Sequence, residues 1–154
     1  STRLEAFVDA AFAFALTLVV IAGNDIPASV DALVLAMKAV PAYAASFLLI
    51  MRFWFAHGDW SRRYGLDDAT SRRLSVLLVF LVLIFVYPMR MVFSSLFSAL
   101  SGGFLPTTFS IDSHSDVSAM FIMFAVAFGV MGLVMVALYA HAWRQRDALG
   151  LSLV

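Results

Sequence analysis

The chain has 154 residues, of which 63% are hydrophobic and only 13% are charged, and its mean hydropathy is +0.96. A soluble domain carries nearer ~25% charged residues, so this composition is that of an integral membrane protein. The formal net charge of zero gives no electrostatic case for binding nucleic acid, and the absence of cysteine excludes disulfides and thiolate chemistry.

The first hydrophobic segment is the most informative stretch of the chain. Its charges Arg3, Glu5 and Asp9 come first, and a charge-free run then continues to Gly23. A membrane helix needs about 20 mostly apolar residues, so a first span is predicted over residues 4–22. Asp9 falls inside this span, where an ionisable side chain costs about 2.5–3.5 kcal/mol and therefore needs a partner or a pathway.

Three further apolar segments are long enough to span a membrane, at about 39–56, 74–98 and 117–143. Together with the first segment they predict about four transmembrane helices per subunit. The predicted fold class is therefore all-α, an integral membrane helical bundle. No internal repeat divides the chain, so residues 1–154 are expected to form a single transmembrane domain.

Local signals refine the boundaries of these spans. A short amphipathic helix over residues 30–40 is expected to precede the second span. His57 and Gly58 are expected to end the second span, and a polar loop from 59 to 73 follows. Pro88 is expected to kink the third span or to end its membrane part.

Two features inside the spans bear on how the helices pack. Arg52 interrupts the second span near its end, where its guanidinium either reaches the interface or meets Asp9. In the fourth span, Ala125, Gly129 and Gly132 form a small-residue face that lets helices approach closely.

Basic residues predict the orientation in the membrane, because they gather on the cytoplasmic side. Only Lys38 and Arg90 fall on one side of the predicted spans, so both termini are expected to be cytoplasmic in a multi-pass protein of the inner or plasma membrane. The residues on the other side are Arg3, Arg52, Arg62, Arg63, Arg72, Arg73, Arg144 and Arg146. An aromatic belt is expected at the same interface, made by Trp54, Trp60, Tyr64 and Trp143.

Signatures of catalysis are missing from the sequence. It contains no zinc-protease motif, no glycine-rich phosphate loop and no serine nucleophile elbow, so we expect no catalytic residue, no metal site and no enzyme. His57 and His141 end the second and fourth spans at matched depth. They are interpreted either as ordinary interfacial residues or as the two axial ligands of a b-type haem.

The first span carries one face that has two interpretations. At helical spacing this face has an apolar stripe with a hydroxyl in its middle and an amide and a carboxylate at one end. It is either a packing face, with Thr17 bonded back to its own helix, or the wall of a pore in a symmetric oligomer. The residues of the stripe are Ala10, Phe14, Thr17, Ile21, Asn24 and Asp25.

The start of the chain resembles the transmembrane protein 175 family of lysosomal and bacterial potassium channels. Arg3-Leu-Glu-Ala-Phe7-Val-Asp9 is similar to the family signature Arg-x-x-x-Phe-Ser-Asp, and the following Phe12-Ala-Phe-Ala-Leu-Thr17-Leu-Val-Val is similar to the run found in bacterial members. Ser46-Phe47 with Trp54 and His57 resembles a second family stretch in the next span, and Pro88 matches a recurring proline.

This resemblance implies that the chain forms a homotetramer around a pore lined by the first helix. Phe14 and Ile21 are then expected to form hydrophobic constrictions, and no cofactor is implied beyond the permeant potassium ion. The residues expected along the ion path are Thr17, Ala13, Asn24 and Asp25. The signature residues Arg3, Phe7 and Asp9 are expected to form a structural network with Trp54 and His57.

The chain departs from the family pattern in three respects. Val8 replaces the signature serine, which removes one hydroxyl from the network, and Phe14 stands where the family usually has isoleucine or leucine. Bacterial members usually have six spans, whereas four are predicted here.

The sequence therefore predicts a potassium-selective cation channel with a hydrophobic constriction, in contact with potassium ions and the lipid bilayer. The alternatives are a non-conducting membrane scaffold or regulatory subunit, and a haem-binding four-helix membrane protein.

Overall fold

The computed structural model of the chain describes residues 2–21, 26–107 and 109–150. These residues form five α-helices, which confirms the predicted all-α class. The helices are α1 (Arg3–Ile21), α2 (Val30–Lys38), α3 (Val40–Tyr64), α4 (Ala69–Leu100) and α5 (His114–Arg144).

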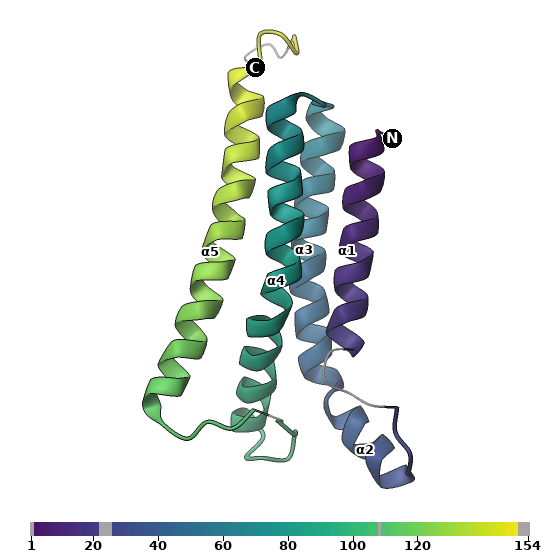
Figure 1. Ribbon diagram of the computed structural model, residues 1–154, viewed down its shortest axis with the longest axis vertical. Helices are drawn as coiled ribbons and strands as arrows, with labels where there is room; N and C mark the ends of the chain where they lie inside the picture. The colour runs from purple at the N-terminus through teal and green to yellow at the C-terminus, as the bar shows by residue number, and fades with distance from the viewer. Residues whose placement is uncertain (1, 22–25, 108, 151–154) are drawn as a thin grey trace.

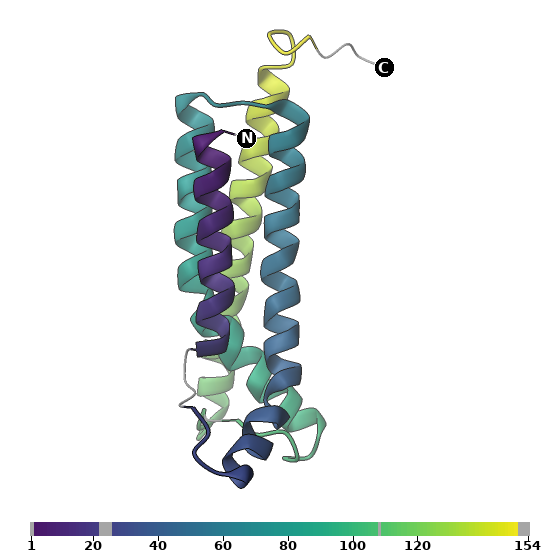
Figure 2. The same cartoon turned by 90° about the vertical axis from the view of Figure 1, so that its right-hand side faces the viewer.

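Four long helices, α1, α3, α4 and α5, run side by side, and the short α2 lies at the end of the bundle away from both termini (Figure 1). Turning the molecule places α1 in front of α3 and α4, with α5 behind them (Figure 2). Among the described residues, α1 contacts α3 and α4 but does not contact α5. One side of α1 is therefore covered by the bundle, and its other side is not.

Helix α3 is longer than predicted, because it continues through His57 and Gly58 to Tyr64. Gly65, in the left-handed conformation at φ 59°, closes the helix by donating its N–H to the Ser61 carbonyl. The prediction that a loop begins at residue 59 was wrong. A glycine costs a helix only about 1 kcal/mol relative to alanine, and the burial of Trp60 and Ser61 beyond it outweighs that loss.

Helix α4 runs through Pro88 without ending there. A proline inside a helix removes one backbone hydrogen bond and costs about 3 kcal/mol in an exposed setting. Phe85, Val86 and Met89 beside it are at most 1% exposed. Packing on both sides of the proline therefore holds the helix together.

The predicted amphipathic helix over 30–40 is present as α2, and it meets α3 at an angle of 43°. Ser29 caps its start by accepting a hydrogen bond from the Ala32 N–H, at 3.1 Å from Oγ. Pro41 occupies the first turn of α3, where a helix needs no N–H donor. None of the residues of α2 is buried.

An aromatic cluster joins the three larger helices. Phe124 and Phe128 of α5 stack with their rings 6.2 Å apart, and Phe85 of α4 lies 5.3 Å from Phe124. Phe53 of α3 meets Phe128 edge to face at 5.6 Å. These rings, rather than small residues, set the spacing of α5 from its neighbours.

No described helix of this chain packs on the small-residue face of α5, so the expected role of this face in helix packing stays a prediction. Ala125 and Gly129 are exposed, and a Cβ added at Gly129 or Gly132 would meet no atom within 4 Å. The opposite side of α5 packs on the bundle through larger side chains such as Met131 and Leu138, which are fully buried.

The structure also corrects the expected aromatic belt. Trp143 is 59% exposed, as a belt residue should be, but Trp60 is fully buried. The indole of Trp60 donates from Nε1 to the carbonyl oxygen of Leu138 in α5, at 2.9 Å. Trp60 is therefore a core residue that joins α3 to α5.

Three of the four predicted spans have candidates among the described helices. Within the described part of the chain, α4 and α5 are long and apolar enough to cross a membrane, and the bent pair of α2 and α3 gives a third candidate. The helix of the first predicted span, α1, has 19 residues and carries three charges, Arg3, Glu5 and Asp9, among its first seven. Residues 22–25, at the predicted end of the first span, lie outside the described residues.

Candidate functional site

Helix α1 presents one packed face and one uncovered face, and the expected pore residues lie on the uncovered one. Val8, Phe12, Ala15 and Val19 are at most 2% exposed and pack in the core. Phe14, in contrast, is 57% exposed. The uncovered face repeats every three to four residues, as one side of a helix must. The exposed residues of α1 are Arg3, Ala6, Phe7, Asp9, Ala10, Ala13, Phe14 and Thr17.

Three other residues expected on this face are not placed. The backbone of Ile21 ends α1, but its side chain lies outside the described residues, as do Asn24 and Asp25. Their expected roles in a constriction and at the mouth of an ion path therefore stay predictions.

Thr17 is bonded back to its own helix. Its hydroxyl donates to the carbonyl oxygen of Ala13, at 3.0 Å from Oγ1. This bond uses the one proton of the hydroxyl and leaves the lone pairs of the oxygen as acceptors. Thr17 thus presents to its exposed side an oxygen that accepts but does not donate, which is what a cation requires of a ligand.

The structure brings Asp9 and Trp54 together, two residues of the expected signature network. The Trp54 indole donates from Nε1 to the Asp9 carboxylate, at 2.7 Å from Oδ1. A charged acceptor makes this hydrogen bond stronger than one between neutral groups. The bond ties the first third of α1 to α3, so Asp9 has a partner from the neighbouring helix.

His57 does not join that bond. It is buried, and its Nε2 lies 2.9 Å from the hydroxyl of Ser75 in α4. Arg3 lies exposed at the start of α1, and Phe7 is 52% exposed. The expected network therefore divides into an Asp9–Trp54 contact and a separate His57–Ser75 contact.

A second tie between α1 and α3 was missed in the sequence. The hydroxyl of Ser61 donates to the Glu5 carboxylate, at 2.6 Å from Oε1. Glu5 also forms a capping box with Thr2, in which each residue's side chain accepts a hydrogen bond from the other's backbone N–H. The Thr-x-x-Glu pattern was visible in the sequence. The Ser61 contact was hidden because α3 was expected to end before it.

These contacts surround a pocket of about 240 Å³ at the end of the bundle where the termini lie. Its polar lining comes from the first two turns of α1 and from α3, and includes Glu5, Asp9, His57, Ser61 and Arg62.

Arg52 is exposed on α3 and does not meet Asp9, whose carboxylate receives the Trp54 indole. The structure therefore does not support the interpretation in which Arg52 forms an ion pair with Asp9.

Both histidines considered as haem ligands are already engaged. His57 Nε2 is held by Ser75, and His141 Nε2 lies 2.9 Å from the carboxylate of Asp68. Neither ring therefore presents its Nε2 to a haem iron, and the structure adds no observation that supports the haem interpretation.

The Asp68–His141 contact joins the start of α4 to the end of α5. Burial raises the pKa of Asp68, but hydrogen bonds from the Ser71 hydroxyl, the Thr70 N–H and His141 outweigh it and lower the pKa to about 2. The carboxylate also caps α4, since Thr70 N donates to it at 3.1 Å.

Acid is expected to weaken this contact. Because the pKa of Asp68 is lower in the folded than in the unfolded state, its stabilisation is complete above about pH 4 and is lost as the pH falls toward about 2. Its side chain is 40% exposed, so solvent screening limits the effect to about 1 kcal/mol. We expect Asp68→Asn, measured by unfolding midpoints in detergent, to flatten the stability curve between about pH 4 and pH 2.

Asp67→Asn is the matched control, because Asp67 lies next in the chain but pairs with Arg72 rather than His141. It should keep the wild-type slope. An unchanged slope in Asp68→Asn would contradict the assignment.

The bundle and the composition define a helical membrane protein with several spans. The sequence model of the family described as "Endosomal/lysosomal potassium channel TMEM175" matches residues 3–88, more than half of the chain. The chain therefore belongs to the TMEM175 family, which is a family of channels and not of enzymes.

One relative and one solved structure are similar to this chain over nearly its whole length. One, from Marivirga tractuosa and named "Potassium channel", is 30% identical over 98% of this chain. The chain spans only 63% of that relative's length. The other is a variant of the potassium channel MtTMEM175, crystallised with a nanobody–MBP fusion protein. It is 27% identical, with a TM-score of 0.89 over 99% of this chain and 67% of that one.

Proposed function

We propose that this chain is a subunit of a potassium-selective channel, in which the exposed face of α1 lines the pore of a homotetramer. Membership of the TMEM175 family supports the activity, since the relative and the solved structure are both named as potassium channels. The single observation that carries the assignment of the pore is the uncovered face of α1.

This face fits a pore wall in its chemistry. From Ala10 through Ala13 and Phe14 to Thr17 it carries no charge, and it is not covered by other helices of its own subunit. Repeated around a symmetry axis, each residue becomes a ring. Rings of Phe14 make a dry constriction that an ion passes only by losing water, and Thr17 oxygens replace part of that water.

Selectivity follows from the same arrangement. Potassium holds its hydration water less tightly than sodium, so a dry constriction followed by hydroxyl ligands favours potassium. Ile21 is proposed as the next apolar ring, and Asn24 and Asp25 as groups that concentrate cations at the outer mouth.

The proposed orientation places both termini in the cytoplasm. The first and last described residues lie at the same end of the bundle as the end of α3, the start of α4 and the end of α5 (Figure 1). Basic residues are concentrated in these helix ends. Arg62, Arg63, Arg72 and Arg144 belong to them, as the distribution of positive charge requires on the cytoplasmic side.

Ion flux tests the proposal. Liposomes that contain the purified protein and are loaded with potassium chloride should release potassium without a potassium ionophore, when a proton ionophore lets protons enter to balance the charge. Liposomes loaded with sodium chloride should release sodium more slowly. A non-conducting scaffold or regulatory subunit gives no flux above empty liposomes, and that result would reject the channel.

Thr17→Ala tests the hydroxyl. We expect the potassium-to-sodium permeability ratio to fall severalfold, because one good hydrogen-bond acceptor is worth about 1 kcal/mol, near fivefold. Bi-ionic reversal potentials in planar bilayers measure the ratio. Thr17→Ser is the control and should keep most of it, since the hydroxyl remains. An unaltered ratio with intact flux in Thr17→Ala would remove Thr17 from the ion path.

A further inference from the structure

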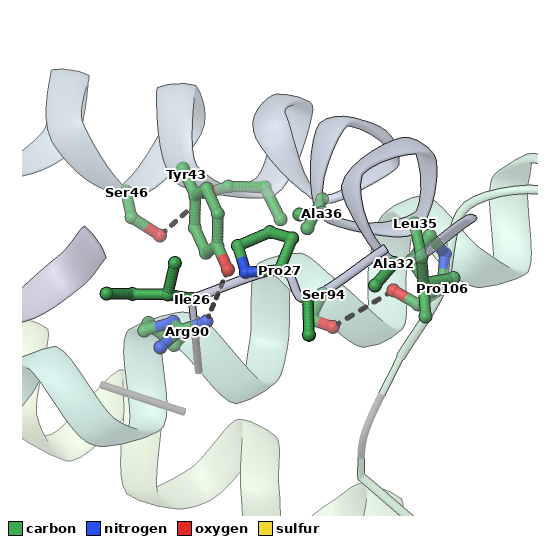
Figure 3. Close-up of a pocket in the computed structure, with 13 residues that line it drawn as sticks. Ile26, Pro27, Ala32, Leu35, Ala36, Tyr43, Ser46, Arg90, Ser94 and Pro106 are labelled. Atoms are coloured by element: carbon green, nitrogen blue, oxygen red, sulfur yellow. Dashed lines mark hydrogen bonds between the residues drawn. The ribbon is translucent and has the colours of Figure 1, made fainter. Parts of the chain in front are cut away.

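A cavity of about 370 Å³ lies beside α2, at the end of the bundle opposite the termini. It is lined by residues 26–28, α2, the start of α3, the second half of α4 and Pro106 of the loop that follows α4 (Figure 3). Ligand sites in proteins usually measure ~300–1,000 Å³, so its size suits a small molecule or the head of a larger one.

One cation dominates this cavity. Arg90 of α4 lines it, and its guanidinium donates from Nη2 to the hydroxyl of Tyr43 in α3, at 3.2 Å (Figure 3). The same guanidinium lies over the Tyr43 ring, 4.8 Å from its centre. Both contacts hold the arginine in place, and neither neutralises its charge. Among the described residues that line the cavity there is no carboxylate.

The other polar groups of the cavity differ in whether they have a proton left to donate to a ligand. Tyr43 accepts from Arg90 and keeps its own O–H proton to donate, so a guanidinium and a phenol point donors at the same space. The hydroxyls of Ser46 and Ser94 instead donate to backbone carbonyl oxygens, of Ala42 at 2.9 Å and of Pro106 at 3.5 Å. The donors of the cavity are thus concentrated at Arg90 and Tyr43, which is the arrangement that binds an oxyanion.

The rest of the wall is apolar and opens onto an apolar surface. Alanines of α2 and α3, among them Ala36, line it with small side chains. Ile26 and Leu35, at its edge, are 94% and 56% exposed. A free inorganic ion gains nothing from such a wall, whereas an acyl chain attached to the anion packs against it.

The position of Arg90 in α4 also carries an energetic cost. It follows an apolar run in α4, and only Lys38 shares its side of the predicted spans. An arginine in such a segment is retained where it meets a partner at membrane depth. We propose that the Arg90–Tyr43 cavity binds a phosphate oxyanion, and that this phosphate is the head group of an anionic phospholipid in the outer leaflet.

Binding can be measured on the purified chain in an uncharged detergent. Dioctanoyl phosphatidylglycerol should raise the thermal unfolding midpoint in a saturable way, because a ligand of the native state stabilises it. Dioctanoyl phosphatidylcholine supplies the same tails with no net charge, and sodium phosphate supplies the anion with no tail. Both should give a smaller rise, and if sodium phosphate binds as tightly as the lipid, the lipid assignment is overturned.

Two variants test the site itself. Arg90→Gln should raise the Kd for phosphatidylglycerol by about tenfold or more, the value of a charge-assisted hydrogen bond. Ala36→Leu should weaken binding because it fills the cavity while the positive charge of Arg90 remains. If Arg90→Gln does not fold, Ala36→Leu still tests whether the lipid binds in this cavity.

Lys38→Gln is the matched control. Lys38 is the other basic residue at this end, but it lies over the ring of Phe104, at 4.3 Å, and does not line the cavity. Its loss should leave the Kd unchanged. Binding equal to wild type in Ala36→Leu, or a loss in Lys38→Gln as large as in Arg90→Gln, would overturn the proposal. Ion flux plays no part in this measurement, so its result is independent of the proposed channel activity.

Discussion

Phe14→Ala is expected to raise the single-channel conductance about tenfold and to lower the potassium-to-sodium ratio. Phe14 is 57% exposed on the uncovered face of α1, five residues beyond Asp9. In the proposed tetramer the four Phe14 rings form the narrowest part of the pore, and an alanine in their place leaves room for water. Lowering the barrier to permeation by about 1.4 kcal/mol already gives tenfold, and a wetted constriction no longer selects by dehydration.

The control for this substitution is Phe80→Ala. Phe80 lies on α4 and is 58% exposed, so the two variants remove the same side chain from equally open positions on different helices. Planar-bilayer recordings of both variants, with wild type, measure conductance and reversal potential. Phe80→Ala should behave as wild type. An unchanged conductance in Phe14→Ala would place Phe14 on a packing face against lipid or a neighbouring subunit.

The long apolar helices were predictable because the membrane leaves few alternatives. A backbone that crosses hydrocarbon must satisfy its own hydrogen bonds, so runs such as 74–98 and 117–143 become helices whatever their neighbours are. Both runs lie inside the observed α4 and α5. The uncovered stripe on α1 could also be predicted from the sequence. Phe14 and Thr17 follow the helical period, so recognising the stripe requires no knowledge of the other helices.

The features that could not be predicted from the sequence depend on contacts between helices. Gly58 signalled an end of α3 by local rules, but Trp60 beyond it is buried against α5, and burial decided the outcome. The same error concealed Ser61 as the partner of Glu5. Ala125 and Gly129 carry a packing pattern that this chain leaves exposed, because a pattern of small residues does not say which helix approaches it.

The candidate site shows the same division. The sequence marked Asp9 as a charge in need of a partner, and Trp54 supplies it. It also paired His57 with the signature residues, whereas the nearer hydroxyl of Ser75 on α4 holds that ring. Which of two polar neighbours a buried side chain takes is set by distances of an ångström or two, and residue spacing along one helix cannot resolve them.

Trp60→Ala is expected to destabilise the bundle by about 3–5 kcal/mol, the usual cost of truncating a buried aromatic residue. Trp60 is 0% exposed, lies 5.6 Å from the His57 ring, and donates to Leu138 in α5. Since lipid is as apolar as a protein core, the loss comes from the packing contacts and from the hydrogen bond rather than from exposure to water. Unfolding by sodium dodecyl sulfate in mixed micelles, followed by circular dichroism, measures it.

Trp143→Ala is the matched control for this prediction. It removes the same side chain from the same end of the bundle, but Trp143 is 59% exposed, so we expect a change of about 0.5 kcal/mol or less. Trp60→Phe separates the packing contribution from that of the hydrogen bond, because it keeps an aromatic ring in the core and loses the hydrogen bond to Leu138. Equal losses in the two alanine variants would contradict the role of Trp60 as the link between α3 and α5. That link matters for the site, because α3 also carries Trp54, and a loosened α3 would release the Asp9 contact that positions α1.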